Sequence, residues 1–78
     1  GAWFEMDGGR VLVHRASLSG EHVAQGTIAP RDGAPTLGLA EGSITLDVVQ
    51  PAGKAAMTGA SWLNGRRGVG GYLERSGE

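Results

Sequence analysis

The stretch that decides the predicted fold runs from Ala55 to Arg75 and reads AAMTGASWLNGRRGVGGYLER. Near its middle, Asn64-Gly65 lies between two runs that can each extend as a strand. An Asn-Gly pair flanked in this way is the strongest short-range signal for a β-hairpin, because both residues tolerate the positive φ angles of a type I′ turn. The sequence therefore predicts a C-terminal hairpin, and the rest of the fold is expected to pack around it.

The two strands of this hairpin would have different faces, because successive side chains of a strand point to opposite sides. The core face would carry Ala56, Thr58, Ala60, Trp62, Arg67, Val69, Gly71 and Leu73, with Arg67 stacked on the Trp62 ring. The outer face would be nearly bare around Ser61, because Gly59, Gly68 and Gly70 have no side chains there. The pattern predicts a shallow trough on the outside of the hairpin.

Strand glycines mark a bend, a bulge or the close approach of another molecule. Three interpretations of the trough are therefore open: a sharply bent barrel, which the sequence favours, a protein partner or second subunit, and a flat ligand. The candidate binding residues of the hairpin come from the trough and from its rim. They are Met57, Ser61, Trp62, Leu63, Arg66, Arg67 and Tyr72.

A second hairpin is predicted at the N-terminus, where Ala2–Met6 and Arg10–Arg15 flank Asp7-Gly8-Gly9. Either Asp7-Gly8 or Gly8-Gly9 can occupy the two turn positions. In both registers the same four apolar side chains share one face, which we assign to the core. They are Phe4, Met6, Val11 and Val13.

The sequence pattern in the middle of the chain predicts further short strands and no capped helix. Strands are expected over Glu21–Ala29, Thr36–Ala40 and Ser43–Gln50, with a loop over Pro30–Pro35. In the last strand Ile44, Leu46 and Val48 alternate, so they are expected to face the core. We predict an all-β fold in one domain over residues 1–78: a small antiparallel barrel or sandwich of six to seven short strands, with N-terminal and C-terminal β-hairpins and little or no helix.

Composition excludes several classes of function. The 78 residues include 15 glycines and no cysteine, and the net charge is −1. A chain without cysteine has no disulfide or thiolate metal site, and a charge near zero does not attract nucleic acid over its whole surface. His14, His22 and Glu21 lie on separate expected strands, so no metal or cofactor is predicted. No apolar run is long enough to span a membrane; the compartment stays open, since the chain begins with Gly.

The sequence contains no catalytic motif. Ser61 lies in Gly59-Ala60-Ser61-Trp62-Leu63, which lacks the second glycine of a nucleophile elbow, and Gly65–Tyr72 lacks the ending of a phosphate-binding loop. We therefore predict no enzyme and no catalytic residue, but a non-catalytic β-domain that acts through protein–protein contact, either as a homo-oligomer or on a target protein. The alternative hypothesis is a barrel that binds single-stranded nucleic acid or a glycan through Trp62, Arg66, Arg67 and Tyr72.

Overall fold

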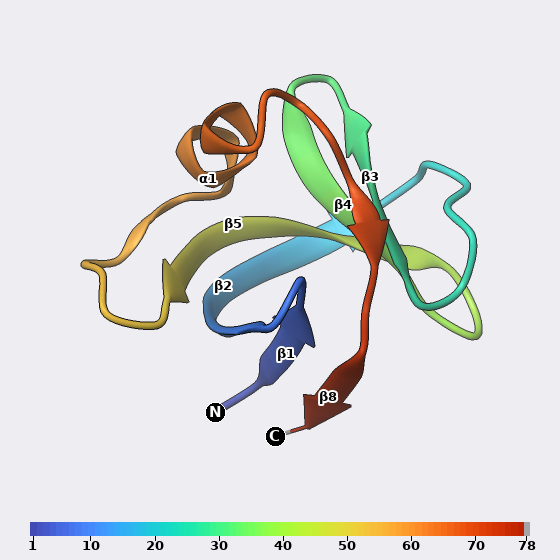
Figure 1. The fold of residues 1–78 in the computed structure, drawn as a ribbon. Helices are drawn as coiled ribbons and strands as arrows, with labels where there is room; N and C mark the ends of the chain where they lie inside the picture. The colour runs from blue at the N-terminus through green and yellow to red at the C-terminus, as the bar shows by residue number, and fades with distance from the viewer. Residues whose placement is uncertain (78) are drawn as a thin grey trace.

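The computed structural model describes residues 1–77, and over that range it contains eight strands and one short helix (Figure 1). In chain order these are β1 (Trp3–Met6), β2 (Gly9–Ser19), β3 (Thr27–Arg31), β4 (Ala34–Gly38), β5 (Ser43–Pro51), β6 (Met57–Thr58), α1 (Gly59–Gly65), β7 (Gly71–Tyr72) and β8 (Arg75–Gly77). The predicted fold class, all-β with little helix, is confirmed.

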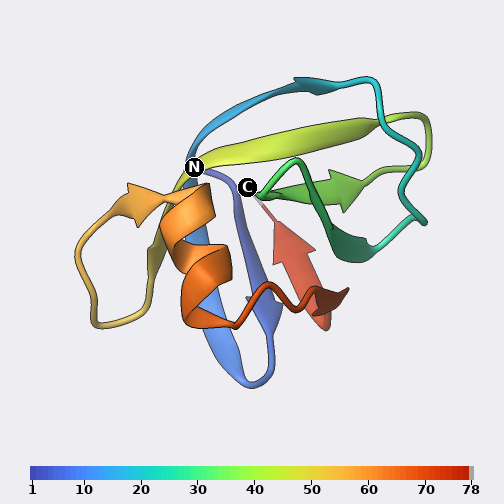
Figure 2. The same cartoon turned by 90° about the horizontal axis from the view of Figure 1, so that it is seen from above.

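The strands form one curled antiparallel sheet in the order β7-β3-β4-β5-β2-β1-β8, with β6 paired to β5 (Figure 2). The two ends of this order are consecutive in the sequence. Ile28 of β3 pairs with Gly71, whereas Phe4 of β1 pairs with Ser76. The final segment of the described chain thus joins the first and third strands, and the half-barrel is closed on that side by residues 71–77.

The N-terminal hairpin is confirmed, and its register is now fixed. Met6 pairs with Gly9, so Asp7 and Gly8 are the two turn residues. Their φ angles are 53° and 79°, as a type I′ turn requires. Phe4, Met6 and Val11 are buried, and Val13 packs against them. The core face predicted from the alternation is correct.

The segment predicted as a loop over Pro30–Pro35 is instead a tight hairpin between β3 and β4. Pro30 pairs with Pro35 across it, and Asp32-Gly33 form a two-residue turn with φ angles of 52° and 75°. Proline is normally rare within paired strands, but here the two prolines lie opposite each other. The predicted strand over 21–29 is also wrong in its first part, because residues 20–26 form a connection.

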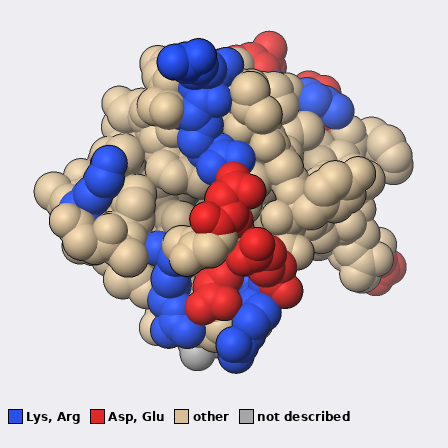
Figure 3. Space-filling view, viewed as in Figure 1, with Lys and Arg blue, Asp and Glu red and all other residues tan. Residues whose placement is uncertain are grey.

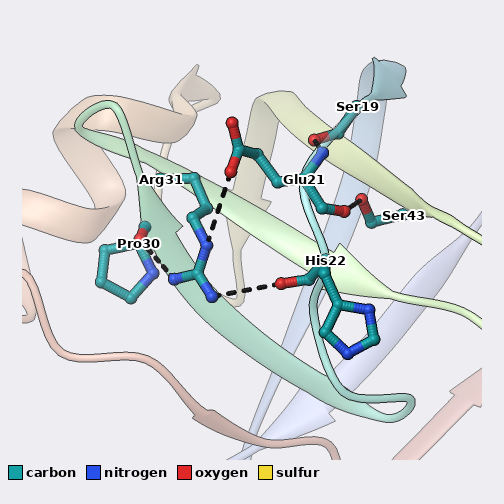
Figure 4. A network of polar contacts seen from close by, with 6 residues as sticks. All are labelled: Ser19, Glu21, His22, Pro30, Arg31 and Ser43. Carbon is teal, nitrogen blue, oxygen red and sulfur yellow. Dashed lines mark hydrogen bonds and ion pairs between the residues drawn. The ribbon is translucent and has the colours of Figure 1, made fainter.

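This connection is held against the sheet by polar contacts (Figure 4). The Arg31 guanidinium donates to the carbonyl of His22 at 3.2 Å and lies 4.0 Å from the Glu21 carboxylate. The buried Ser43 hydroxyl donates to the carbonyl of Glu21 at 2.7 Å. The backbone of Ala24 also crosses directly over Gly38, where a side chain would collide with it. These contacts fix residues 21–26 beside β4.

Strand β5 does not keep a strict alternation. Leu46 and Val49 are both fully buried, whereas Val48 is only half-buried. The reason is an irregular register with β2: Val13 pairs with Val49, Arg15 with Val48, and then Ala16 with Leu46. A bulge in each strand shifts the side chains between faces. The prediction that Val48 faces the core is wrong for this reason.

The predicted C-terminal hairpin does not exist, because residues 59–65 form α1. The Thr58 hydroxyl accepts from the Ser61 N–H at 3.1 Å and caps the helix N-terminus. Gly59 begins the helix so close to β5 that an added Cβ would lie 1.8 Å from the Leu46 carbonyl oxygen. Asn64-Gly65 is therefore the helix C-terminus, and tertiary packing has overridden a local turn signal.

The core lies inside the curled sheet, under α1. The rings of Phe4 and Trp62 meet edge to face, with centroids 5.9 Å apart. Leu63 is also buried, and α1 contacts β4, β5 and β6. The helix therefore closes one end of the barrel. The prediction that Trp62 and Leu73 face the core is correct, whereas Val69 is 59% exposed.

Candidate functional site

The seven candidate binding residues of the predicted hairpin do not line a common surface. Trp62 and Leu63 are buried in the core under α1, and Met57 and Arg66 are half-buried. Ser61, Arg67 and Tyr72 are exposed, but they lie on the helix, on its C-terminal turn and on β7. Because the hairpin is absent, the trough is absent too. A binding role for the exposed residues stays a prediction.

Arg66, rather than Arg67, lies against Trp62. Its guanidinium carbon is 5.3 Å from the centroid of the indole ring. The same group donates to the carbonyls of Val69 and Gly70 and forms an ion pair with Asp7 at 2.8 Å. Arg66 thereby joins α1, the turn after it and the tip of the N-terminal hairpin. Because these contacts link three segments of the domain, we assign Arg66 a structural role.

Charges of opposite sign gather on the face shown in Figure 3, around β1 and β8. Glu5 lies 3.3 Å from Arg10 and 3.8 Å from Arg75, and Arg31 pairs with Glu21. Within residues 1–77, three basic side chains have no acidic partner. We call Arg15, Lys54 and Arg67 the free basic residues, and all three are exposed.

Each free basic residue lies on an element that contacts β5, or in the segment that directly follows β5 or such an element. Arg15 is on β2, where it pairs with Val48 of β5, and Val48 in turn pairs with Thr58 at the start of α1. Lys54 is in the loop that joins β5 to β6, and Arg67 follows the end of α1. Sequence patterns do not predict this set, because nothing local tells a paired arginine from a free one.

The end of the barrel opposite α1 is open. A largely apolar cavity of about 470 Å³ lies there between the two chain ends and the β4–β5 turn. We call it the mouth. It is lined by Ala2, Trp3, Phe4, Val13, Ala16, Gln25, Gly26, Leu37, Gly38, Leu39, Ala40, Ile44, Leu46, Leu73, Ser76 and Gly77.

The described part of the chain presents no set of side chains arranged for catalysis. His14 bonds to the Gln50 amide at 2.7 Å rather than to a serine, and the hydroxyls of Ser19 and Ser43 bond to backbone groups of Glu21. No three His, Asp or Glu side chains of residues 1–77 converge as metal ligands. The helix found in that range has seven residues, too few to cross a membrane.

Comparison with known proteins places the chain in a family. Residues 1–67 match the family described as Formyl transferase, C-terminal domain. The chain is 46% identical over 71 residues to a methionyl-tRNA formyltransferase of Methylobacterium sp. (strain 4-46) and 44% identical to one of Methylobacterium nodulans, covering 86% of this chain in each case. A methionyl-tRNA formyltransferase of Clavibacter sepedonicus is 37% identical over 67 residues, or 83% of this chain.

The chain spans about a fifth of the length of these relatives, 22% in each case. The matches contradict the hypothesis of a non-catalytic β-domain that acts through protein–protein contact, because they indicate a domain of an enzyme. They also contradict the prediction that the chain does not belong to an enzyme, because formyl transferases are enzymes. Sequence patterns could not reveal this, since residues 1–77 hold no catalytic set. This chain therefore belongs to the formyl transferase C-terminal domain family, which matches residues 1–67.

Proposed function

We propose that this chain is the C-terminal domain of a methionyl-tRNA formyltransferase and that it binds the tRNA, while the formyl transfer occurs in another part of that enzyme. The observation that carries the proposal is the match of 86% of the chain to enzymes of that name, at 46% identity. A domain with no catalytic set of its own among residues 1–77 contributes most directly to such an enzyme by holding the substrate.

The free basic residues support this role. Affinity for RNA comes largely from cationic side chains that neutralise phosphates, and a cation already paired with a carboxylate contributes less. Arg15, Lys54 and Arg67 have no such pairing within the described residues, and each lies on or next to an element that contacts β5. Asp47 of β5 is next to Val48, the strand partner of Arg15, so the surroundings of Arg15 are only moderately basic. We therefore expect it to contribute contacts that supplement those from the rest of the enzyme.

The test uses the full-length enzyme in a methionyl-tRNA formylation assay. Arg15→Gln, Lys54→Gln and Arg67→Gln should each raise the KM for methionyl-tRNA by a few fold and leave kcat nearly unchanged. Each should also lower the dependence of log KM on log salt by about one unit, since one phosphate contact is lost. The matched control is Arg75→Gln, because Arg75 is as exposed but lies in the Glu5 cluster on β8.

Two outcomes would contradict the proposal in different ways. A full-length protein that does not formylate methionyl-tRNA would refute the assigned activity. An active enzyme whose KM and salt dependence are unchanged in all three variants would show that the free basic residues do not bind the RNA.

A further inference from the structure

Apolar side chains are exposed to solvent at the mouth of the barrel and beside it. Leu39, which lines it, is 41% exposed. Leu18 is 92% exposed and pairs directly with Ile44, another lining residue, so both side chains are on the same face of the sheet. A contiguous apolar surface of this kind marks a place where something binds.

The strand edge beside the mouth is also incomplete. Strand β2 has 11 residues, but β1 has only four. The last contact between them is the hydrogen bond from the Val13 N–H to the Ala2 carbonyl, at 2.9 Å. Beyond it, residues 14–19 pair with β5 on one edge and with no strand of the described chain on the other. An edge of this length, next to apolar side chains, is normally covered.

The first residues of the chain lie beside the mouth. Ala2 and Gly77 both line the mouth, and Trp3 pairs with Gly77. Figure 1 shows β1 and β8 on the side of the barrel away from α1. Polypeptide attached at Gly1 is therefore held beside the mouth. Such attachment gives a segment a high effective concentration, so modest apolar contacts are enough to keep it bound.

We propose that the mouth and the free edge of β2 are the binding site for the segment of the full-length enzyme that directly precedes Gly1. The inference rests on the proposed function, under which this chain is about a fifth of a longer polypeptide. The lining is mostly apolar, so the covering segment should present aliphatic or aromatic side chains rather than charges. The segment also fixes the orientation of the domain, because it is held at the mouth as well as at its covalent link.

The experiment measures thiol alkylation in the full-length enzyme without RNA. Ala16→Cys places a thiol in the mouth, and Ser17→Cys places one on the opposite face of the same strand. Both positions are exposed in the domain; Ser17→Cys is nearly isosteric, and Ala16→Cys adds one sulfur atom. Because the domain has no cysteine of its own, peptide mass spectrometry locates each label directly. We expect the thiol introduced by Ala16→Cys to react at least about tenfold more slowly than the one introduced by Ser17→Cys.

Equal alkylation rates in the two variants would overturn the inference. A slow rate in Ala16→Cys that becomes fast on dilution would also overturn it, because the mouth would then be covered by a second copy. The formylation assay is run on the same samples. An active enzyme with an unprotected thiol at position 16 leaves the proposed function standing and removes this inference, whereas protection in an inactive protein does the reverse.

Discussion

The Arg66 guanidinium reaches the carboxylate of Asp7, 2.8 Å away, and so joins the turn after α1 to the tip of the N-terminal hairpin. The two partners differ in burial, since the Arg66 side chain is 23% exposed and that of Asp7 is 69% exposed. A carboxylate so well hydrated contributes little through the ion pair itself. The contacts of Arg66 with Trp62, Val69 and Gly70 should therefore matter more than its contact with Asp7.

Replacing Arg66 should consequently destabilise the domain more than replacing Asp7. We expect Arg66→Ala to lower the free energy of unfolding by about 1–2 kcal/mol, since it removes a cation–π contact and two hydrogen bonds to carbonyls. Asp7→Asn should cost less than about 1 kcal/mol, because asparagine also tolerates the positive φ of this turn position. Urea unfolding gives both values, and Arg67→Ala is the control. Equal effects of the two Arg→Ala variants would contradict the role assigned to Arg66.

Two glycines of α1 should respond to alanine in opposite ways. At Gly59 an added Cβ would lie 1.8 Å from the Leu46 carbonyl oxygen, so Gly59→Ala should destabilise the fold by about 2–3 kcal/mol or more. At Gly65 the space is open and φ is not positive, so Gly65→Ala should be neutral or stabilise by up to about 1 kcal/mol. Thermal melts distinguish the two. A large loss of stability in Gly65→Ala would indicate that Asn64-Gly65 forms a type I′ turn and not the end of a helix.

The Thr58 cap should be measurable through its hydroxyl. Thr58→Ala removes the acceptor for the Ser61 N–H and should cost about 1 kcal/mol, whereas Thr58→Ser keeps an oxygen there and should cost only a few tenths. Both variants keep an exposed side chain, so differences in burial are small. Chemical unfolding monitored by tryptophan fluorescence measures the stability of both variants. An alanine variant as stable as the serine variant would show that the hydroxyl does not cap α1.

The buried Ser43 hydroxyl should be needed to hold residues 20–26 against the sheet. Ser43→Ala leaves the Glu21 carbonyl without its donor, and we expect a loss of about 1 kcal/mol of global stability. Hydrogen exchange should also become faster at the amides of Gly26 and Thr27, which bond to Gly38 and Ala24. Ser19→Ala removes only an exposed acceptor and is the matched comparison. Unchanged exchange in Ser43→Ala would contradict this contact.

Sequence patterns predict the fold class and the N-terminal hairpin because both depend on local signals. Asp7-Gly8 fixes its own turn, and Phe4, Met6 and Val11 alternate around it. The same kind of signal fails at Asn64-Gly65. The helix there has only two buried apolar side chains, Trp62 and Leu63, which is too few to show a helical period.

The remaining differences depend on contacts between distant parts of the chain. Val49 is buried in place of Val48 because two bulges interrupt the pairing of β5 with β2. The free basic residues can be identified only from the ion pairs of the folded chain, and the mouth only from the order of its strands. No catalytic motif among positions 1–77 indicates the formyl transferase family, so only comparison with relatives could reveal it.

The pairing of β1 with β8 has a mechanical consequence. Trp3 lies opposite Gly77, and Glu5 lies opposite Arg75, so both chain ends leave the ladder from the same side. A force that pulls the two ends apart would open this ladder one pair at a time, starting at Trp3, instead of shearing all its hydrogen bonds together. The barrel should therefore resist stretching weakly along this axis, and the first event on extension should be the release of residues 75–77 from the sheet.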